Sequence, residues 1–326
     1  MPSISSVYVD KALTNAAVAR KRNKFIAEEV FPVLPVGQQS GKVFTYDPNG
    51  EAYRASDDKR APGTEARRAD FEVNTDITYF AKNHALAAVV PDEELANADA
   101  GIRPLLDRTN FLLDKLDLVK EIALVSSLPT ILSSYTSSPT NKWDAYTGGS
   151  AGDPIGDLLT AIQSVMTASG ATPNRIALDS LVLKAIANHP DFIDRCKYTM
   201  GPGAMQGAGP ATLLGNLLSL DPEDPIKVVV ASGSVKNTAV EGQTASKSRV
   251  WGENVLIYRY EPPQIGTSVL GVHVVWSAAD GGAGGKRVMR MRDEKAHGEW
   301  IEASTYYDQI LLKSDAGYLY TNVLNA

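Results

Sequence analysis

The residue types and spacings that could support catalysis begin with a serine in a glycine-rich segment. Residues Gly148 to Gly152 read GGSAG and match the G-x-S-x-G pattern, in which Ser150 would be the nucleophile of a hydrolase. That pattern requires a buried strand directly before the serine and a helix directly after it. Polar residues precede Ser150, and the next helix is expected to have its own cap at Asp153. We therefore interpret the segment as a linker, with a serine hydrolase as a distant alternative.

Two further glycine-rich segments invite comparison with phosphate-binding loops. The run Asp280 to Arg287 has an aspartate where a phosphate loop has its first glycine, and Arg287 stands where Ser or Thr would hold magnesium. The segment Gly201 to Pro210 precedes a helix but lacks the lysine and the strand-helix unit of an anion site. Both are interpreted as loops, and no cofactor site is predicted.

Metal ligands and a reactive thiol are also not indicated. The histidines are far apart, and none has a second ligand three or four residues away in a helix: His84, His189, His273 and His297. The acidic run Asp221 to Pro225 is interrupted by prolines and is interpreted as a solvated turn. The single cysteine, Cys196, has no nearby cluster of bases and is expected to be a buried structural thiol. We predict no catalytic residue, no metal and no enzymatic activity.

Composition narrows the class of protein. The net charge of −6 disfavours a dedicated nucleic-acid binder, and the one basic cluster, Arg20 to Lys24, is followed by Glu28 and Glu29. The first thirty residues lack the apolar core of a secretory signal, and no apolar run approaches the length that spans a bilayer. We expect a soluble chain, made in a reducing cytosol, without membrane contact.

The most informative local pattern is a long hairpin over residues 42–80. Apolar residues alternate with polar ones on the outgoing strand, which is typical of a strand with one apolar face: Phe71, Val73, Thr75, Ile77 and Tyr79. Five acids and five bases form the tip: Glu51, Arg54, Asp57, Asp58, Lys59, Arg60, Glu65, Arg67, Arg68 and Asp70. A two-stranded hairpin is marginal in water unless its apolar face packs on something else. We therefore predict inter-subunit contacts through the tip residues Asp57, Asp58, Lys59, Arg60, Arg67 and Arg68. The predicted apolar contact face is Phe71, Val73, Ile77 and Tyr79.

The remaining elements indicate a mixed α+β chain. An arm over 1–24 is followed by an extended apolar strap over 25–36, in which Pro32 and Pro35 withhold two donors from any sheet. A helix over 104–128 has an apolar stripe that includes Leu112, Leu116, Val119 and Ala123, with Lys120 away from it. Residues 133–152 are expected to be a mobile connection between two domains. Helices are expected over 154–170, 180–188, 191–198 and 212–218. Strands are expected over 85–90, 175–178, 227–231, 255–260, 269–276, 287–292, 300–305 and 309–313.

Read in order, several stretches resemble the front half of a tailed-bacteriophage major capsid protein. They are VDKALTN from Val9, FPVLPV from Phe31, QSGKVFTY from Gln39, RAPGTEA from Arg60, and VPDEELANAD from Val90, which leads to LLDRTNFLLDKLDLVKEIAL. Their order and spacing, rather than any single stretch, carry the resemblance. After Asp153 the match is looser and lies mostly in ALDSLVLKAIANHP from Ala177 and in the closing strands.

This resemblance implies a fold, shared by tailed-phage capsids and encapsulins, with an N-terminal arm, an extended β-hairpin loop, a peripheral domain on a long spine helix, and an axial domain. The corresponding boundaries are arm and strap 1–41, extended loop 42–82, peripheral domain 83–147 with spine helix 104–128, axial domain 148–278, return to the peripheral domain 279–305, and axial closing strands 306–326. The arm resemblance begins by Val9, which favours a separate scaffolding protein over a long cleaved leader. Lys42, Lys59 and Lys82 cannot be matched to the crosslinking lysine of some relatives.

The implied function is self-assembly into the icosahedral capsid that encloses the double-stranded DNA of a tailed phage. The implied partners are many copies of the chain in hexamers and pentamers, a scaffolding protein, a portal, decoration proteins and packaged DNA, which an acidic chain would contact weakly. The virion is the expected location, with assembly in the bacterial cytoplasm. Two alternatives stay open, a compartment or gene-transfer shell with the same fold and a monomeric binding module.

Overall fold

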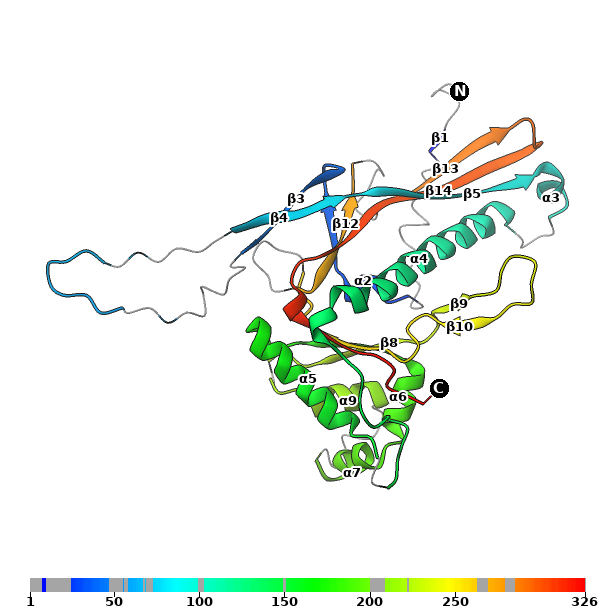
Figure 1. Cartoon of the computed structure of the whole chain (residues 1–326). Helices are drawn as coiled ribbons and strands as arrows, with labels where there is room; N and C mark the ends of the chain where they lie inside the picture. The colour runs from blue at the N-terminus through cyan, green and yellow to red at the C-terminus, as the bar shows by residue number, and fades with distance from the viewer. Residues whose placement is uncertain are drawn as a thin grey trace.

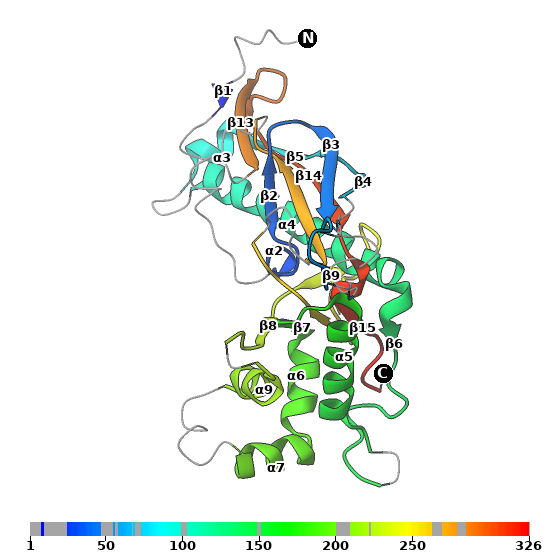
Figure 2. The same cartoon turned by 90° about the vertical axis from the view of Figure 1, so that its left-hand side faces the viewer.

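The computed structural model describes residues 8–9, 25–46, 55, 58–66, 68, 73–98, 103–148, 151–199, 209–221, 223–262, 269–278 and 285–325. The chain forms two lobes and a hairpin that extends far from both of them (Figure 1). One lobe contains a long twisted sheet and helix α4, and the other a second sheet covered by helices (Figure 2). No helix in this described part is long and apolar enough to cross a membrane.

The sheet of the upper lobe has six strands in the order β1-β13-β14-β12-β2, with β5 on the other side of β14. Their bounds are β1 Tyr8–Val9, β2 Val33–Val36, β5 Lys82–Pro91, β12 Gly271–Trp276, β13 Lys286–Asp293 and β14 Gly298–Leu311. The fourteen-residue strand β14 contains all of the strand expected at 300–305 and the first three residues of the one expected at 309–313. Helix α4 packs on one face of this sheet, where Leu112, Leu116, Val288 and Ile301 form a common core. The short helix α3 (Asp92–Ala96) follows β5 directly.

The strap over 25–36 differs from its prediction. Its first part forms the helix α2 (Ala27–Val30), and Val30 and Phe31 are fully buried. Its second part, β2, joins the sheet as a parallel edge strand beside β12. The carbonyl oxygens of Pro32 and Val36 accept hydrogen bonds from the backbone N of His273 and Ser277, so the even-numbered residues of β2 face β12. Pro35 is odd-numbered, so the side on which it lacks an N–H is the open edge of the sheet. The prolines therefore do not keep the strap out of a sheet.

Helix α4 (Pro104–Ile131) begins at the expected proline and is three residues longer than predicted. Leu112 and Leu116 are buried as expected, but Val119 is 50% exposed, and Ala123 is exposed too. In their place the helix buries Lys120 and Glu121, together with Leu124, Val125 and Leu128. The predicted stripe is therefore wrong in its second half, because the helix leaves the upper sheet there and packs on other elements.

The lower lobe has a five-stranded sheet in the order β6-β15-β11-β7-β8. Its bounds are β6 Thr136–Ser137, β7 Arg175–Asp179, β8 Lys227–Ala231, β11 Val255–Tyr258 and β15 Gly317–Tyr320, the last preceded by a 3-10 turn, η4, at Ser314–Ala316. Its helices are α5 Pro154–Ser169, α6 Ser180–Ala187, α7 Pro190–Thr199 and α9 Pro210–Leu218. A small hairpin, β9 (Val235–Asn237) and β10 (Lys247–Arg249), projects beside α4 (Figure 1). As predicted, Asp153 caps α5 by accepting from Gly156 N at 2.8 Å, and Gly170 ends it with φ 69°.

The predicted mobile connection over 133–152 is wrong for its described residues. A 3-10 turn, η3 (Ser133–Tyr135), leads into β6, which pairs with β15. Trp143 is fully buried in the lower core, and its Nε1 donates to Asp157 Oδ2 at 2.8 Å. Thus β6 and Trp143 belong to the lower lobe, whereas β12 (Gly271–Trp276) belongs to the upper sheet.

Candidate assembly interface

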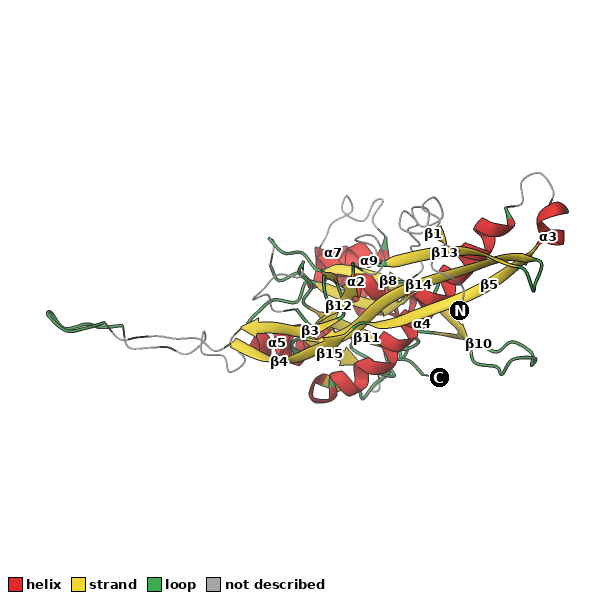
Figure 3. Cartoon of the chain, turned by 90° about the horizontal axis from the view of Figure 1, so that it is seen from above, coloured by secondary structure: helices red, strands yellow, loops and turns green. Residues whose placement is uncertain are grey.

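The hairpin consists of β3 (Ser40–Tyr46) and β4 (Val73–Phe80), paired antiparallel with a bulge between Val43 and Thr45. Its base is attached to the upper sheet. Tyr79 is only 9% exposed and packs with Val272, Val274 and Ile310 of that sheet. Gly41 lies against the Tyr79 ring, where a Cβ would come within 2.8 Å of the Tyr79 hydroxyl. The hairpin is therefore held at its base and projects from there (Figure 3).

The structure separates the four residues of the predicted apolar contact face. Tyr79 is buried in this chain's own core and Ile77 is half-buried against it, so these two residues anchor the hairpin. Val73, farther out, is 40% exposed, and Phe71 lies outside the described residues. The other face of the hairpin carries Phe44 and Phe80, which are 51% and 52% exposed. Sequence reasoning missed this second face, although Phe44 directly follows Val43 and so points to the opposite side of the strand.

The described tip residues Asp58, Lys59, Arg60 and Arg68 are all exposed. Arg60 Nε donates to Thr64 O at 2.5 Å, and the Thr64 hydroxyl donates to Ala61 O at 2.8 Å. Asp57 and Arg67 lie outside the described residues. The charges at the tip therefore face solvent, and pairing them with a second protein would require little desolvation.

The two lobes and the strap meet at a buried carboxylate. Glu121 is fully buried, and its Oε2 accepts from the backbone N of Ile26 at 2.7 Å and of Ala27 at 3.3 Å. Its Oε1 accepts from Ser234 Oγ at 2.5 Å and from Trp251 Nε1 at 2.8 Å. Burial raises the pKa of Glu121, and these donors oppose that rise. One side chain of α4 thereby joins the strap and the segment that leads into β11.

The adjacent residue of α4 makes a second contact with the strap. Lys120 Nζ lies 2.9 Å from Glu28 Oε1, and this lysine holds the pKa of Glu28 down to about 2. His273 is buried in the same place, with Nε2 3.1 Å from Ala27 O, and burial lowers its pKa well below the ordinary value. Glu28, Lys120 and His273 therefore join α2, α4 and β12.

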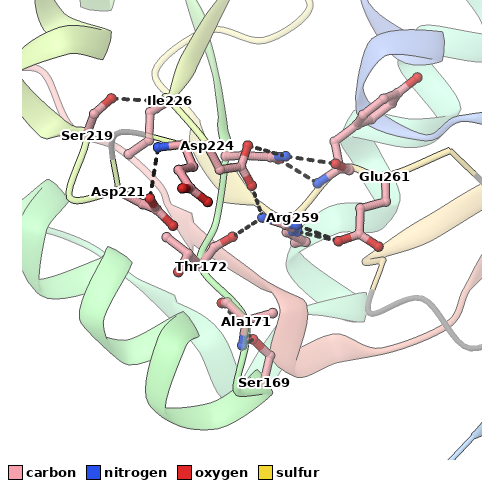
Figure 4. A network of polar contacts seen from close by, with 12 residues as sticks. Ser169, Ala171, Thr172, Ser219, Asp221, Asp224, Ile226, Arg259 and Glu261 are labelled. Carbon is pink, nitrogen blue, oxygen red and sulfur yellow. Dashed lines mark hydrogen bonds and ion pairs between the residues drawn. The ribbon is translucent and has the colours of Figure 1, made fainter.

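A polar network lies at one end of the neighbouring strands β7, β8 and β11 of the lower sheet (Figure 4). Arg259 follows β11 and contacts Asp224 and Glu261, and its Nη1 also donates to Thr172 O at 2.8 Å. Asn174 accepts from Tyr260 N at 2.9 Å and donates to Tyr260 O at 2.9 Å. These contacts join loops that are distant in sequence. We interpret the network as structural.

Most of the segments considered for catalysis or phosphate binding fall at least partly outside the described residues. Ser150 lies outside the described residues, as do Gly201 to Ala208 and Asp280 to Gly284. Gly152 is packed against backbone, since a Cβ there would lie 2.4 Å from Lys142 O. Among the described residues no group of three His, Cys, Asp or Glu side chains could hold a metal ion. Cys196 is buried as predicted, and burial raises the pKa of its thiol.

Two curated relatives match the chain along most of its length. The major capsid protein of Pseudomonas phage JBD67 is 28% identical over 258 residues, which is 77% of each chain. The major capsid protein of Burkholderia phage BcepMu is 21% identical over 315 residues, which cover 97% of this chain and 96% of the relative. No protein-family model matches the chain.

Solved structures match the fold almost from end to end. A phage-related protein of Bordetella bronchiseptica RB50 aligns with a TM-score of 0.72 at 24% identity, over 97% of this chain and 98% of that protein. The capsid of cyanophage P-SCSP1u aligns with a TM-score of 0.55 at 12% identity, over 93% and 89%. The capsid of a gene-transfer-agent particle aligns with a TM-score of 0.53 at 14% identity, over 93% and 91%.

The architecture is therefore that of a viral shell subunit, with two lobes, a long helix and a projecting hairpin. More particularly, it is the fold of the major capsid proteins of tailed phages, and the resemblance indicated by the sequence is confirmed.

Proposed function

We propose that this chain is the structural subunit that self-assembles into the capsid of a tailed phage. The observation that carries the proposal is the hairpin, whose base is packed in the chain's own core through Tyr79 while the side chains of Val73, Phe44 and Phe80 stay exposed. A projection of this kind is stable at its root and offers apolar surface to another molecule. Curated relatives named as major capsid proteins support the same conclusion.

In the proposed mechanism the hairpin of one copy lies on the next copy, which makes a head-to-tail contact that can close into rings. Val73 and the two exposed phenylalanines contribute apolar area, and the tip charges Asp58, Lys59, Arg60 and Arg68 form ion pairs with complementary groups. Individual exposed pairs contribute only ~0–1 kcal/mol. Repetition over a closed shell makes such small contributions decisive.

The wider assembly belongs to the same proposal. Hexamers and pentamers of the chain would form the shell, with a separate scaffolding protein, a portal and decoration proteins as partners, in the host cytoplasm. In this proposal the upper lobe, with helix α4, is the peripheral domain of the capsid fold, and the lower lobe is the axial domain. Packaged DNA would be contacted weakly, because the net charge of the chain is −6. No enzymatic step is proposed.

One alternative keeps the fold and changes the contents. A gene-transfer-agent capsid is among the similar structures, so a shell with other contents is compatible with this architecture. The nucleic acid or protein extracted from purified particles distinguishes the two functions. Phage genomes of uniform length support the capsid, whereas random host DNA or an enclosed enzyme supports the alternative.

The test of the proposed function is electron microscopy of the purified chain, expressed with and without its neighbouring genes. The full chain is expected to form closed shells in at least one preparation. Deletion of Asp57 to Arg68 is expected to leave a folded chain, by circular dichroism, that forms no regular shells. A mass near 35.0 kDa in light scattering under all conditions would instead indicate a monomeric module. Normal shells from the deletion would contradict the role of the hairpin.

A further inference from the structure

Strands β4 and β5 form one nearly continuous extended segment from Val73 to Pro91, interrupted only at Ala81 (Figure 3). The two halves of this segment pair on opposite sides. Ala81 N donates to Gln39 O, on the side of β3, whereas Phe80 N donates to Asp308 Oδ2, just beyond the β5 partner Tyr307 of β14. Successive residues of a strand direct their peptide groups to opposite sides. Strand β3 therefore lies on one side of the segment and β14 on the other.

This arrangement leaves one edge of β5 without a partner strand in the described chain. Even-numbered residues face β14, as the contact of Val90 O with Gly298 and the bond from Asp92 N to His297 O both indicate. The odd-numbered residues Asn83, Ala85, Ala87 and Val89 therefore direct N–H and C=O outward. Pro91, which has no N–H, also falls on the outward side.

The bare edge lacks the usual protection against strand pairing. Exposed edge strands of proteins that stay monomeric are usually short, charged or bulged. Strand β5 has ten residues, pairs with β14 without a register shift, and carries a fixed charge only at its first residue, Lys82. Its other ionisable residue, His84, stacks on Tyr307 with ring centroids 4.2 Å apart, and burial lowers its pKa. The edge is therefore long and regular, and its protecting residues, Lys82 and Pro91, stand only at its two ends.

We propose that the bare edge of β5 binds an extended strand of a second copy of this chain by main-chain hydrogen bonding. The proposal rests on the proposed function, because assembly is what brings a second copy to this edge. A second copy is the expected partner because the bare edge of β5 begins next to Ser40, the first residue of β3, on the same side of the segment from Val73 to Pro91. An added strand would lie end to end with the hairpin and would continue the contact proposed for it. The small, exposed side chains of Ala85 and Ala87 share one face of the sheet and leave that face open to neighbouring residues.

The first test is amide hydrogen exchange of the full chain, compared between unassembled subunits and purified particles. In subunits the outward amides of Asn83, Ala85, Ala87 and Val89 should exchange rapidly, and the inward amides of the same strand slowly. In particles the outward amides should become protected to the level of the inward ones. Particles in which the outward amides still exchange rapidly would overturn the edge proposal and leave the proposed function intact. A failure to form particles would count against the proposed function itself.

The second test replaces one outward donor. Ala87→Pro removes an N–H that has no partner strand among the described residues, and proline is tolerated at such edge positions. This variant should keep the circular dichroism spectrum of the wild type and lose at least tenfold in particle yield. Ala87→Val is the matched control, because it enlarges the side chain and keeps the donor, and it should assemble normally. Normal assembly of both variants, with unprotected outward amides in their particles, would exclude main-chain pairing at this edge.

Discussion

Glu28 and Glu29 are adjacent residues of α2, yet their carboxylates contact opposite lobes. Glu28 Oε1 lies 2.9 Å from Lys120 Nζ on α4, and Glu29 Oε2 lies 2.9 Å from Lys227 Nζ on β8. The carbonyl of Glu29 also accepts from Tyr258 and Arg175 of the lower sheet, at 2.8 Å and 3.0 Å. One turn of the strap thus joins the lobes, and movement of one lobe against the other would have to break or shift these contacts.

Removal of the buried carboxylate at this junction should destabilise the whole chain. In Glu121→Ala the indole N–H of Trp251 and the backbone N–H of Ile26 lose this acceptor inside the protein. A buried polar group without its partner costs ~1–3 kcal/mol, so the free energy of unfolding should fall by at least about 3 kcal/mol. Denaturant unfolding measures the change. The control Glu94→Ala removes an exposed ion pair with Arg108 and should change stability by less than about 1 kcal/mol.

The contribution of the Glu28 contact should depend on pH. Lys120, with smaller contributions from Lys286 and His273, lowers the pKa of Glu28 from 4.5 to about 2. A carboxyl group with a lowered pKa stabilises the fold above its ordinary pKa and loses that contribution as the pH falls toward the folded value. The difference in unfolding midpoint between wild type and Glu28→Gln should be largest above pH 4.5 and shrink toward pH 2. A difference that stays constant over this range would contradict the ion pair.

The side of α4 that faces the upper sheet can be tested with three aspartate substitutions. Leu116 is 6% exposed, so Leu116→Asp buries an unpaired charge and should prevent folding. Leu112→Asp should have the same effect. Val119 is 50% exposed, so Val119→Asp should give soluble, helical protein. Soluble yield and far-ultraviolet circular dichroism measure both outcomes. Equal tolerance of Leu116→Asp and Val119→Asp would show that the helix packs differently.

The segment before α5 should behave as part of a core. Trp143 is fully buried and donates to Asp157, so Trp143→Ala should lower the free energy of unfolding by about 3–5 kcal/mol. Tyr146, three residues later, is 37% exposed and provides the control, since Tyr146→Ala should have a much smaller effect. Thermal unfolding of the two variants makes the comparison. A flexible linker would predict no difference between them.

Much of the fold could be predicted because its signals are local. The alternation from Val73 to Tyr79 predicts β4, Pro104 marks the start of α4, and Asp153 and Gly170 bound α5. The edge strand β8 (Lys227–Ala231) was predicted with its observed bounds. Each of these signals depends on a few neighbouring residues and on the period of one element. The order of the stretches that resemble phage capsid proteins also lies in the sequence alone.

Contacts between distant residues could not be predicted in this way. The period of α4 indicated Val119 as buried and Lys120 as exposed, and the structure has the reverse. Lys120 and Glu121 are buried because Glu28, Ser234, Trp251 and the backbone of Ile26 supply their partners. Tyr79 likewise faces the upper sheet rather than a neighbouring copy. The sequence by itself determined the elements and the resemblance. Only the tertiary structure decided which polar groups are buried and which strand edge is bare, because both depend on partners far away in the chain.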